Sequence, residues 1–454
     1  MKRVISIILG MALLLLCGCV PTPEEEYVVN KGDDKAGAEI ESTTAPSEPI
    51  VQPVFPEHWK DNVTTDIAEV VIDADIVFSD LETYPVYLVG RHSFTREEVV
   101  RVANAFFTDM TGVQQGNGMT REEYEAALKS ITDKEFEEET RLLQMQYLQE
   151  VMNSCSATEE GFSDVSELNV SDIPSGLSSR LIIRQADGRS GNLWFNQSEL
   201  AMGKSSISPV QPKSWIDDGG GYIGEKDAVI EASITIEQAI SEAEAFFEKI
   251  GAEGFELAES EEARYFNMYD LSVMSMGWQL QYTRSFGYCP VNASAHAVSE
   301  QKIAASSDVS FSRSWNIEWI DIYVSEYGVE YFNWHNPLND LGVANENVKL
   351  MDFEDLSGII KRYFSAKFGD PDAFVCGYNS IDKMTLTVLP TSKKDSQDAY
   401  MMPVWICEIG LYFSLDAENP YSGFMQPGRH ELQNKETIAF NAIDGAIVIV
   451  PRSQ

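Results

Sequence analysis

Three segments of the chain carry apolar residues at the spacing of an amphipathic helix, each directly after a capping residue. The first follows a capping box at Thr95 and Glu98. The second follows a capping box at Thr235 and Gln238, and the third follows Asp352. Each segment has an aromatic pair near its end and then a glycine that suits a left-handed helix cap, at Gly112, Gly251 and Gly369. The pattern predicts three helices, each ended by its glycine.

The apolar residues of these segments are expected to face the core. They are Val99, Val102, Ala103 and Phe106 in the first helix, Ile236, Ala239, Ile240, Ala243, Phe247 and Ile250 in the second, and Leu356, Ile359, Ile360, Tyr363, Phe364 and Phe368 in the third. A further capping box at Thr120 and Glu123 follows the first helix. Beyond it, apolar spacing predicts a long inserted helix over about residues 134–152.

Other segments alternate apolar and polar residues, which is typical of strands with one covered face. They are Trp278–Tyr282, Ile320–Val324 and Thr385–Val388. Such alternation predicts antiparallel sheets that pack on a single layer of helices.

A repeated order of helix and strands is suggested by the turn glycines Gly188, Gly328 and Gly445. Each precedes a strand-like run, and they lie 76, 77 and 76 residues after the three cap glycines. We therefore predict an α+β fold of about three related units, each with one helix packed on antiparallel strands. The units are expected at 57–215, with the inserted long helix, at 216–345 and at 346–454.

The N-terminus has the pattern of a secretory signal. Lys2 and Arg3 precede an apolar stretch over Val4–Leu16, which is shorter than the roughly 20 residues of a membrane span. Leu16, Gly18 and Cys19 resemble the bacterial lipobox. The resemblance implies a lipoprotein signal peptide over 1–18 and a diacylglycerol on the Cys19 thiol. The alternative is an ordinary secretory signal with an incidental Cys-Gly-Cys.

Residues 19–56 are rich in Pro, Glu, Thr and Ser, a composition that cannot bury enough surface to order itself. They are expected to form a disordered tether. The chain would then be lipid-anchored on the extracytoplasmic face of the cell membrane, with the N-terminal lipid as its only contact with the bilayer.

Composition narrows the possible partners. The 454 residues include 33 basic and 72 acidic side chains, for a formal net charge of -39. A nucleic-acid partner is excluded because phosphates require a basic surface. Four cysteines would remain outside the membrane, where they form disulfides or act as small buried apolar groups: Cys155, Cys289, Cys376 and Cys407. Cys289 and Cys407 occupy equivalent places in their units, so we expect that they do not pair.

Several short runs resemble known families. The lipobox, Val28–Asp33, Pro403–Trp405 and Phe440–Gly445 resemble a family of uncharacterised clostridial gut lipoproteins, which implies no known activity. The Thr235–Gly251 segment and the closing Asn441–Gly445 run are more distantly similar to PepSY-like extracytoplasmic domains. That likeness implies a role in protease inhibition or sensor regulation and assigns no role to any residue.

Motifs for catalysis are missing from the sequence. It contains no HExxH, no GxSxG and no phosphate-binding loop. We therefore predict no catalytic residue, no metal site and no cofactor. His335, at a turn after a strand, is the histidine best placed to act as a general base, and the alternative is an ordinary surface histidine.

Aromatic residues give the remaining candidate site. Trp315, Trp319 and Tyr323 have even spacing along one expected strand face, and Trp334 follows on the next strand. If exposed, the three tryptophans could stack on a glycan or receive a protein ligand, and if buried they belong to the core. We expect a non-catalytic binding or regulatory module. The alternatives are an extracellular hydrolase of glycans or peptides, which needs converging carboxylates, and a solute-binding lipoprotein, which needs a deep interlobe cleft.

Overall fold

The structure is a computed structural model of the whole chain. It describes residues 35–41, 50–65, 68–79, 81–116, 119–132, 138–176, 178–205, 210–213, 231–266, 273–286, 311–313, 315, 317–367, 377–394, 396–414 and 430–449. The signal peptide, Cys19 and the 215/216 boundary lie outside these residues. The expected disorder of the tether is wrong at residues 35–41 and 50–56, because residues 35–40 are helical and Ala36, Ile40 and Phe55 are buried in a core.

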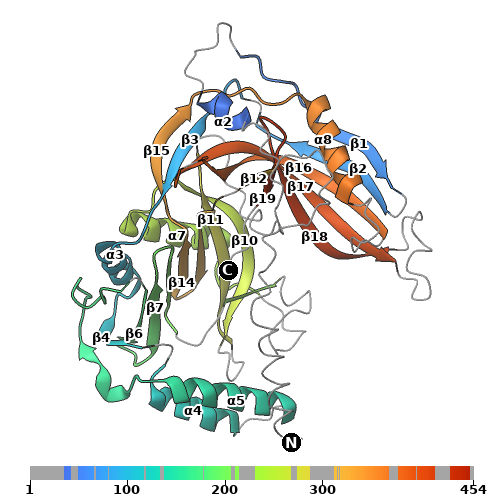
Figure 1. Ribbon diagram of the computed structural model, residues 1–454. Coiled ribbons are helices and arrows are strands. Elements are labelled where there is room, and N and C mark those ends of the chain that lie inside the picture. Colours follow the sequence, from blue (N-terminus) through green and yellow to red (C-terminus); the bar gives the residue numbers. More distant parts are fainter. Residues whose placement is uncertain are drawn as a thin grey trace, which may run out of the picture.

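Two large sheets form the body (Figure 1). The ten-stranded sheet has the order β5-β4-β6-β7-β8-β14-β13-β11-β10-β9 and is antiparallel throughout. Its strands are β4 (Met110–Gln115), β5 (Ser163–Asp164), β6 (Ser179–Gln185), β7 (Ser190–Phe195), β8 (Glu199–Gly203), β9 (Val210–Pro212), β10 (Phe255–Phe266), β11 (Val273–Arg284), β13 (Trp319–Ser325) and β14 (Gly328–His335).

The nine-stranded sheet has the order β1-β2-β16-β17-β18-β19-β12, and β3 joins β15 to β17. Only the β2–β16 and β12–β19 pairs are parallel among its described strands. The strands are β1 (His58–Thr64), β2 (Ala68–Val77), β3 (Val86–Arg91), β12 (Phe311–Arg313), β15 (Leu338–Asn345), β16 (Gly377–Ser392), β17 (Ala399–Ser414), β18 (His430–Asn441) and β19 (Ile447–Ile449).

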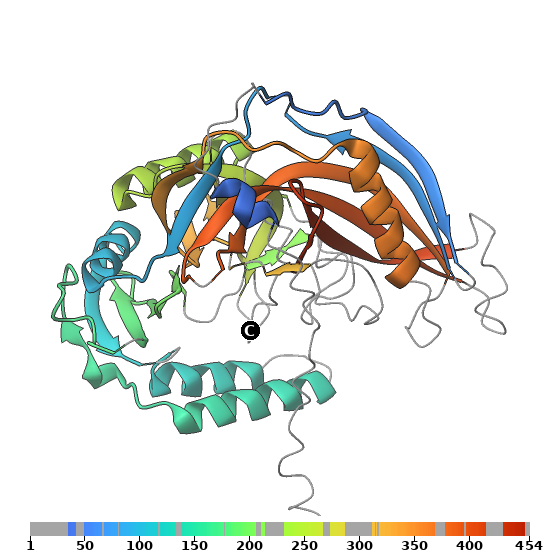
Figure 2. The same cartoon turned by 45° about the horizontal axis from the view of Figure 1, so that its top comes forward.

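Helices cover one side of each sheet. The described helices are α2 (Lys35–Ile40), α3 (Arg96–Phe106), α4 (Arg121–Thr132), α5 (Glu138–Ser154), α7 (Ile236–Ile250) and α8 (Phe353–Lys367), with a short 3-10 turn at Glu159–Gly161. α3 and α7 lie beside each other on the ten-stranded sheet, whereas α8 packs on the nine-stranded sheet (Figure 1). Figure 2 shows α4 and α5 as a projecting pair. The fold is α+β and mostly antiparallel.

The expected helices form, and their caps form in part. Thr95 and Thr235 each make a complete capping box, and Gly251 caps α7 with φ of 67°. The buried residues of α3 are those expected, and α8 buries Leu356, Ile360, Tyr363 and Phe364. The expectation that Gly112 caps α3 is wrong, because α3 ends at Phe106 and Gly112 lies within β4. Gly369 lies outside the described residues.

The segment between β4 and β5 contains two helices, and α5 lies where the long inserted helix was expected. α4 follows the Thr120 capping box, in which the Glu123 carboxylate accepts from the Thr120 backbone N–H. α5 begins at Glu138 and runs beside α4. The pair has a small core of its own, made of Met119, Tyr124, Ile131, Leu148 and Met152.

Strands follow each main helix in the same order. α3 is followed by the neighbouring strands β4, β6, β7 and β8, with α4, α5 and β5 inserted. α7 is followed by β10, β11, β13 and β14, and α8 by β16, β17, β18 and β19. The first two sets join through the β8–β14 pair. The third set pairs instead with β2 and β3, which precede α3 in the chain, and β1 pairs with β2.

Three of the four connections that cross between the two sheets meet at one place: those from β3 to α3, from β12 to β13 and from β14 to β15. The backbone N–H of His92 donates to the Pro337 carbonyl at 2.9 Å. The Asn336 side chain donates to the Ile317 carbonyl at 3.0 Å. Asn336 has a φ of 48°, a left-handed conformation that asparagine tolerates. We call these connections the junction.

Glu318 is the buried charge of the junction, with 2% of its surface exposed. Its carboxylate accepts from the Arg284 guanidinium at 2.5 and 3.0 Å, from Trp334 Nε1 at 3.0 Å and from the Leu338 N–H at 3.2 Å. Arg284 and Trp334 belong to the ten-stranded sheet and Leu338 opens β15 of the other. One carboxylate therefore connects both sheets.

Two of the four cysteines are described, and both are free thiols. Cys155 is half-buried, and Cys407 is fully buried in the core beneath α8. The prediction that Cys407 does not pair with Cys289 is therefore confirmed. Burial raises the pKa of the Cys407 thiol, so it acts as a small apolar side chain. Cys289 and Cys376 lie outside the described residues.

Candidate functional site

The two faces of the ten-stranded sheet differ in chemistry. On the side of α3 and α7, six neighbouring strands place apolar residues in one cross-strand row: Leu181, Leu193, Met202, Phe332, Ile322 and Leu280. All six are at most 2% exposed. This side is a conventional core.

The opposite side carries the alternate residues of the same strands. One row crosses the same six strands in register: Arg180, Trp194, Ala201, Asn333, Asp321 and Gln281. A row with Glu199, His335, Trp319 and Thr283 lies on one side of it, and a row with Asn192, Gly203, Tyr331, Tyr323 and Gln279 on the other. We call these three rows the polar face. The first row spans about 24 Å, since neighbouring strands lie about 4.8 Å apart.

His335 lies between two carboxylates on the polar face. Its Nδ1 is 3.5 Å from Glu199 Oε1 and its Nε2 is 3.6 Å from Asp321 Oδ2. The imidazole stacks on the Trp319 indole, with ring centroids 4.2 Å apart and planes 20° apart. Its side chain is 19% exposed, so the ring is held by its neighbours yet reaches the surface.

The two carboxylates are already hydrogen-bonded to neutral donors. Asp321 accepts from Trp319 Nε1 at 2.9 Å and from Gln281 Nε2 at 3.0 Å. Glu199 accepts from Asn333 Nδ2 at 3.0 Å. The His335 ring separates the carboxylates, so they do not converge on one point. This arrangement orients polar groups across the surface.

Three buried oxygens of the polar face have no hydrogen-bond partner in the part of the chain that the structure describes. They are Asn333 Oδ1, Gln279 Oε1 and Thr283 Oγ1, one from each row. An unpaired buried oxygen costs about 1–3 kcal/mol.

Hydroxyl groups dominate the third row. Tyr323 is hydrogen-bonded to Ser275 Oγ at 3.2 Å. The buried Glu330 carboxylate accepts from Ser275 and Ser325, each at 2.5 Å. Burial raises the pKa of Tyr331 to about 12, so its phenol keeps its proton at neutral pH.

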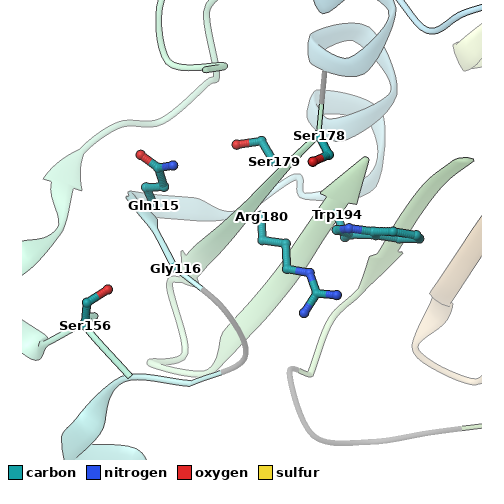
Figure 3. Close-up of a pocket in the computed structure, with 7 residues that line it drawn as sticks. All are labelled: Gln115, Gly116, Ser156, Ser178, Ser179, Arg180 and Trp194. Atoms are coloured by element: carbon teal, nitrogen blue, oxygen red, sulfur yellow. The ribbon is translucent and has the colours of Figure 1, made fainter. Parts of the chain in front are cut away.

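A pocket of about 580 Å³ lies at the Arg180 end of the polar face. Its lining is polar and includes Gln115, Ser156, Ser178, Ser179, Arg180 and Trp194 (Figure 3). The Arg180 guanidinium lies over the Trp194 ring, 5.6 Å from its centroid, and Figure 3 shows the two side by side. This contact holds a charged and an aromatic surface together.

The structure separates the three tryptophans that the sequence grouped. Trp315 is outside β13 and buried at the junction, with the Arg91 guanidinium 5.3 Å from its ring centroid. Trp334 faces α3 and α7, where it contacts Phe94 and Phe255. Trp319 alone of the three lies on the polar face. Its role in ligand stacking stays a prediction, and Cys19 lies outside the described residues.

Sequence reasoning missed most of the polar face, including Arg180, Trp194, Asn333 and Asp321. Asn192 and Trp194 alternate with apolar residues in the sequence, which was a detectable signal within one strand. The pairing that aligns six strands is not encoded in any one segment. In the described residues, no group of three or more His, Cys, Asp or Glu side chains is placed to hold a metal ion. No described helix is long and apolar enough to cross a membrane.

Comparison with known proteins gives a distant likeness in fold. No family model and no curated protein matches the sequence. A solved structure of an uncharacterised protein from Eubacterium rectale ATCC 33656 is similar, with a TM-score of 0.46 and 11% sequence identity. The likeness covers 88% of this chain and 94% of that chain. At this distance it carries no information on function.

Proposed function

We propose that this chain is a non-catalytic, lipid-anchored binding protein on the extracytoplasmic face of the cell membrane, and that its ligand lies on the polar face. The observation that carries the proposal is the row from Arg180 to Gln281, aligned across six strands on the side opposite α3 and α7. A face that served only for packing would be apolar, as the helix side is. The half-buried Trp194, Asp321 and Gln281 of this row support a surface that binds a further molecule.

Binding is favoured over hydrolysis by the carboxylate geometry. Hydrolysis of a glycosidic bond requires two carboxylates that face each other across the bond. Glu199 and Asp321 lie on opposite sides of the His335 imidazole, and both accept hydrogen bonds from side-chain amides. The groups are arranged to hold a ligand and not to activate water.

We also propose that the body consists of three related units, each a helix followed by four neighbouring antiparallel strands. The order α3 with β4, β6, β7 and β8 is repeated by α7 with β10, β11, β13 and β14, and by α8 with β16 to β19. Gly188, Gly328 and Gly445 each precede a late strand with φ of 83°, 79° and 74°. Joining two such units edge to edge would create a sheet wide enough for the polar face.

The anchor can be tested by metabolic labelling with an alkyne fatty acid in the producing bacterium. We expect label on the wild-type chain and on Cys17→Ser, and no label on Cys19→Ser, because only Cys19 follows a small residue at the lipobox position. Cys17→Ser is the matched control. Label on Cys19→Ser, or an unprocessed chain in the cytosol, would contradict the anchor.

Binding can be tested by the thermal shift of the full chain with three classes of probe, namely neutral polysaccharides, a tryptic peptide digest of casein, and free sugars and amino acids. We expect one class to raise the melting temperature of the wild type and of Tyr147→Ala, an exposed aromatic of α5. The shift should be lost in Asp321→Asn. No shift with any class, or an equal shift in Asp321→Asn, would contradict binding at the polar face.

Chromatography of the recovered probe tests the absence of catalysis. We expect the probe unchanged after prolonged incubation. Cleavage by the wild type that is lost in Glu199→Gln would show that the chain is a hydrolase.

A further inference from the structure

We propose that the ligand of the polar face is a neutral polysaccharide chain that lies across the strands. The proposal rests on the proposed binding function and adds the chemical class of the ligand. Three features of the polar face carry it: its length, its aromatic rings, and its half-buried amide and carboxylate groups.

Length favours a chain over a single small molecule. The row from Arg180 to Gln281 crosses six strands, and the spacing of strands makes it about 24 Å long. Sites for small molecules are compact and enclose most of the ligand. Side chains of the polar face are instead half-buried along its length, as Trp194, Tyr331, Asp321 and Gln281 show. An extended polymer can contact all of them at once.

Aromatic rings occur at two separated points of this surface. Trp194 lies toward the pocket and is held by Arg180, and Trp319 lies near the junction and is held by His335. Each ring has a neighbour that fixes its orientation. The carbon-bound hydrogens on one side of a pyranose ring pack against an indole, while the hydroxyls at the ring edge remain free to make hydrogen bonds. Two fixed indoles suit two sugar units of one chain.

Hydrogen bonding favours a ligand that is rich in hydroxyl groups. Gln281, Asp321 and Glu199 are half-buried and bring amide and carboxylate groups to the polar face. Asp321 and Glu199 add acceptor oxygens between them. Sugar hydroxyls donate and accept, so they can satisfy amide and carboxylate oxygens in a row.

Charge and topology disfavour the other polymers. A chain with a net charge of -39, and with two carboxylates on the polar face, repels an anionic polysaccharide. An extended peptide gains most of its affinity by adding a strand at the edge of a sheet, where backbone groups are available. The polar face offers side chains, because the backbone groups of its strands are paired within the sheet.

Native gel electrophoresis of the full chain in detergent tests the ligand class. The gels contain no polymer, or barley β-glucan, arabinoxylan or galactomannan as neutral probes, or polygalacturonate as the anionic probe. We expect at least one neutral probe to retard the wild type and Tyr147→Ala, while polygalacturonate does not. In Trp194→Ala and Asp321→Asn the apparent affinity should fall by at least about tenfold. Thermal unfolding of each variant checks that it is folded.

Three results would overturn the polysaccharide proposal: no retardation by any neutral probe, equal retardation of the wild type and of both polar-face variants, or retardation by polygalacturonate alone. In one outcome, no polysaccharide retards the chain, but the casein peptides raise the melting temperature of the wild type and not of Asp321→Asn. The proposed ligand class is then wrong, and the proposed binding function stands. If neither probe class acts, both proposals fail.

Discussion

In both sheets the side chains of a strand alternate between two faces, but the chemistry of those faces differs between the sheets. In β17 of the nine-stranded sheet, Trp405 and Cys407 enter the core beneath α8, and Val404 and Ile406 enter a second core on the other side. Both faces are apolar, and Trp315, Ile317 and Leu338 of the junction help to cover the second face. In the ten-stranded sheet the side of α3 and α7 is apolar, and the opposite side has a small apolar cluster of Ala263, Tyr265 and Tyr323. In the described residues, the rest of the polar face lacks an apolar cover of this kind, which we attribute to binding.

The largest difference is expected between tryptophans of the two sheets. Trp405 is fully buried, so Trp405→Ala should lower the free energy of unfolding by about 3–5 kcal/mol. Trp319 is half-buried on the polar face, and Trp319→Ala should cost about 1–2 kcal/mol by loss of partial burial and of its hydrogen bond to Asp321. Urea unfolding measures both. Equal losses would show that the polar face is part of the core.

The junction should show the next largest effect. Glu318→Ala leaves the Arg284 guanidinium without its carboxylate and removes the acceptor for Trp334 and Leu338. We expect a loss of about 3 kcal/mol in the free energy of unfolding. Glu242→Ala, an exposed glutamate of α7, is the control and should change it by less than about 0.5 kcal/mol. An unfolding curve for Glu318→Ala that matches the control would contradict the role given to Glu318.

A substitution on the polar face should raise stability. Thr283 is fully buried and its hydroxyl has no partner, so Thr283→Val, which keeps the shape, should add about 1 kcal/mol. Thr120 is equally buried, but its hydroxyl is hydrogen-bonded to Glu123 and Glu159, so Thr120→Val should lose about 1 kcal/mol. Urea unfolding at one pH compares the two. A loss in Thr283→Val as large as that in Thr120→Val would mean that the polar face is built for stability.

The smallest effect is a pH dependence in the nine-stranded sheet. Hydrogen bonds to Asp75 and Asp73, at 2.9 and 2.6 Å, raise the pKa of His58 above 6.5. A raised pKa stabilises the fold fully below the unfolded value, and this contribution is lost as the pH rises through the folded value. The melting temperature of the wild type relative to His58→Gln should therefore fall slightly between pH 6 and pH 8. A difference that rises over this interval would contradict the assignment.

Local signals predicted local structure. Thr95 and Thr235 with their partners three residues later were enough to place α3 and α7, and Gly188, Gly328 and Gly445 marked true left-handed turns. Gly112 was misassigned, because a glycine after an aromatic pair looks the same in a helix cap and in a strand. α5 lies where the apolar spacing predicted the long inserted helix, whereas α4 was signalled only by the Thr120 capping box.

Non-local pairing could not be predicted. Nothing in the sequence shows that β8 pairs with β14, yet this pair brings Glu199 next to His335 and connects two sets of strands. Trp315 and Trp319 lie in different surroundings because the chain crosses from one sheet to the other within a few residues. Trp334 lies one residue from His335, so alternation places it on the opposite face.

The central claim is most directly tested by fluorine NMR of the full chain labelled with 5-fluorotryptophan, titrated with the neutral polysaccharide that retards it most. Tryptophans of both sheets report in one spectrum, and Trp→Phe variants assign their signals. We predict that the Trp194 and Trp319 signals shift with saturation while those of Trp59 and Trp405 stay in place. Shifts confined to Trp59 and Trp405, or unchanged Trp194 and Trp319 signals at saturation, would contradict binding on the polar face.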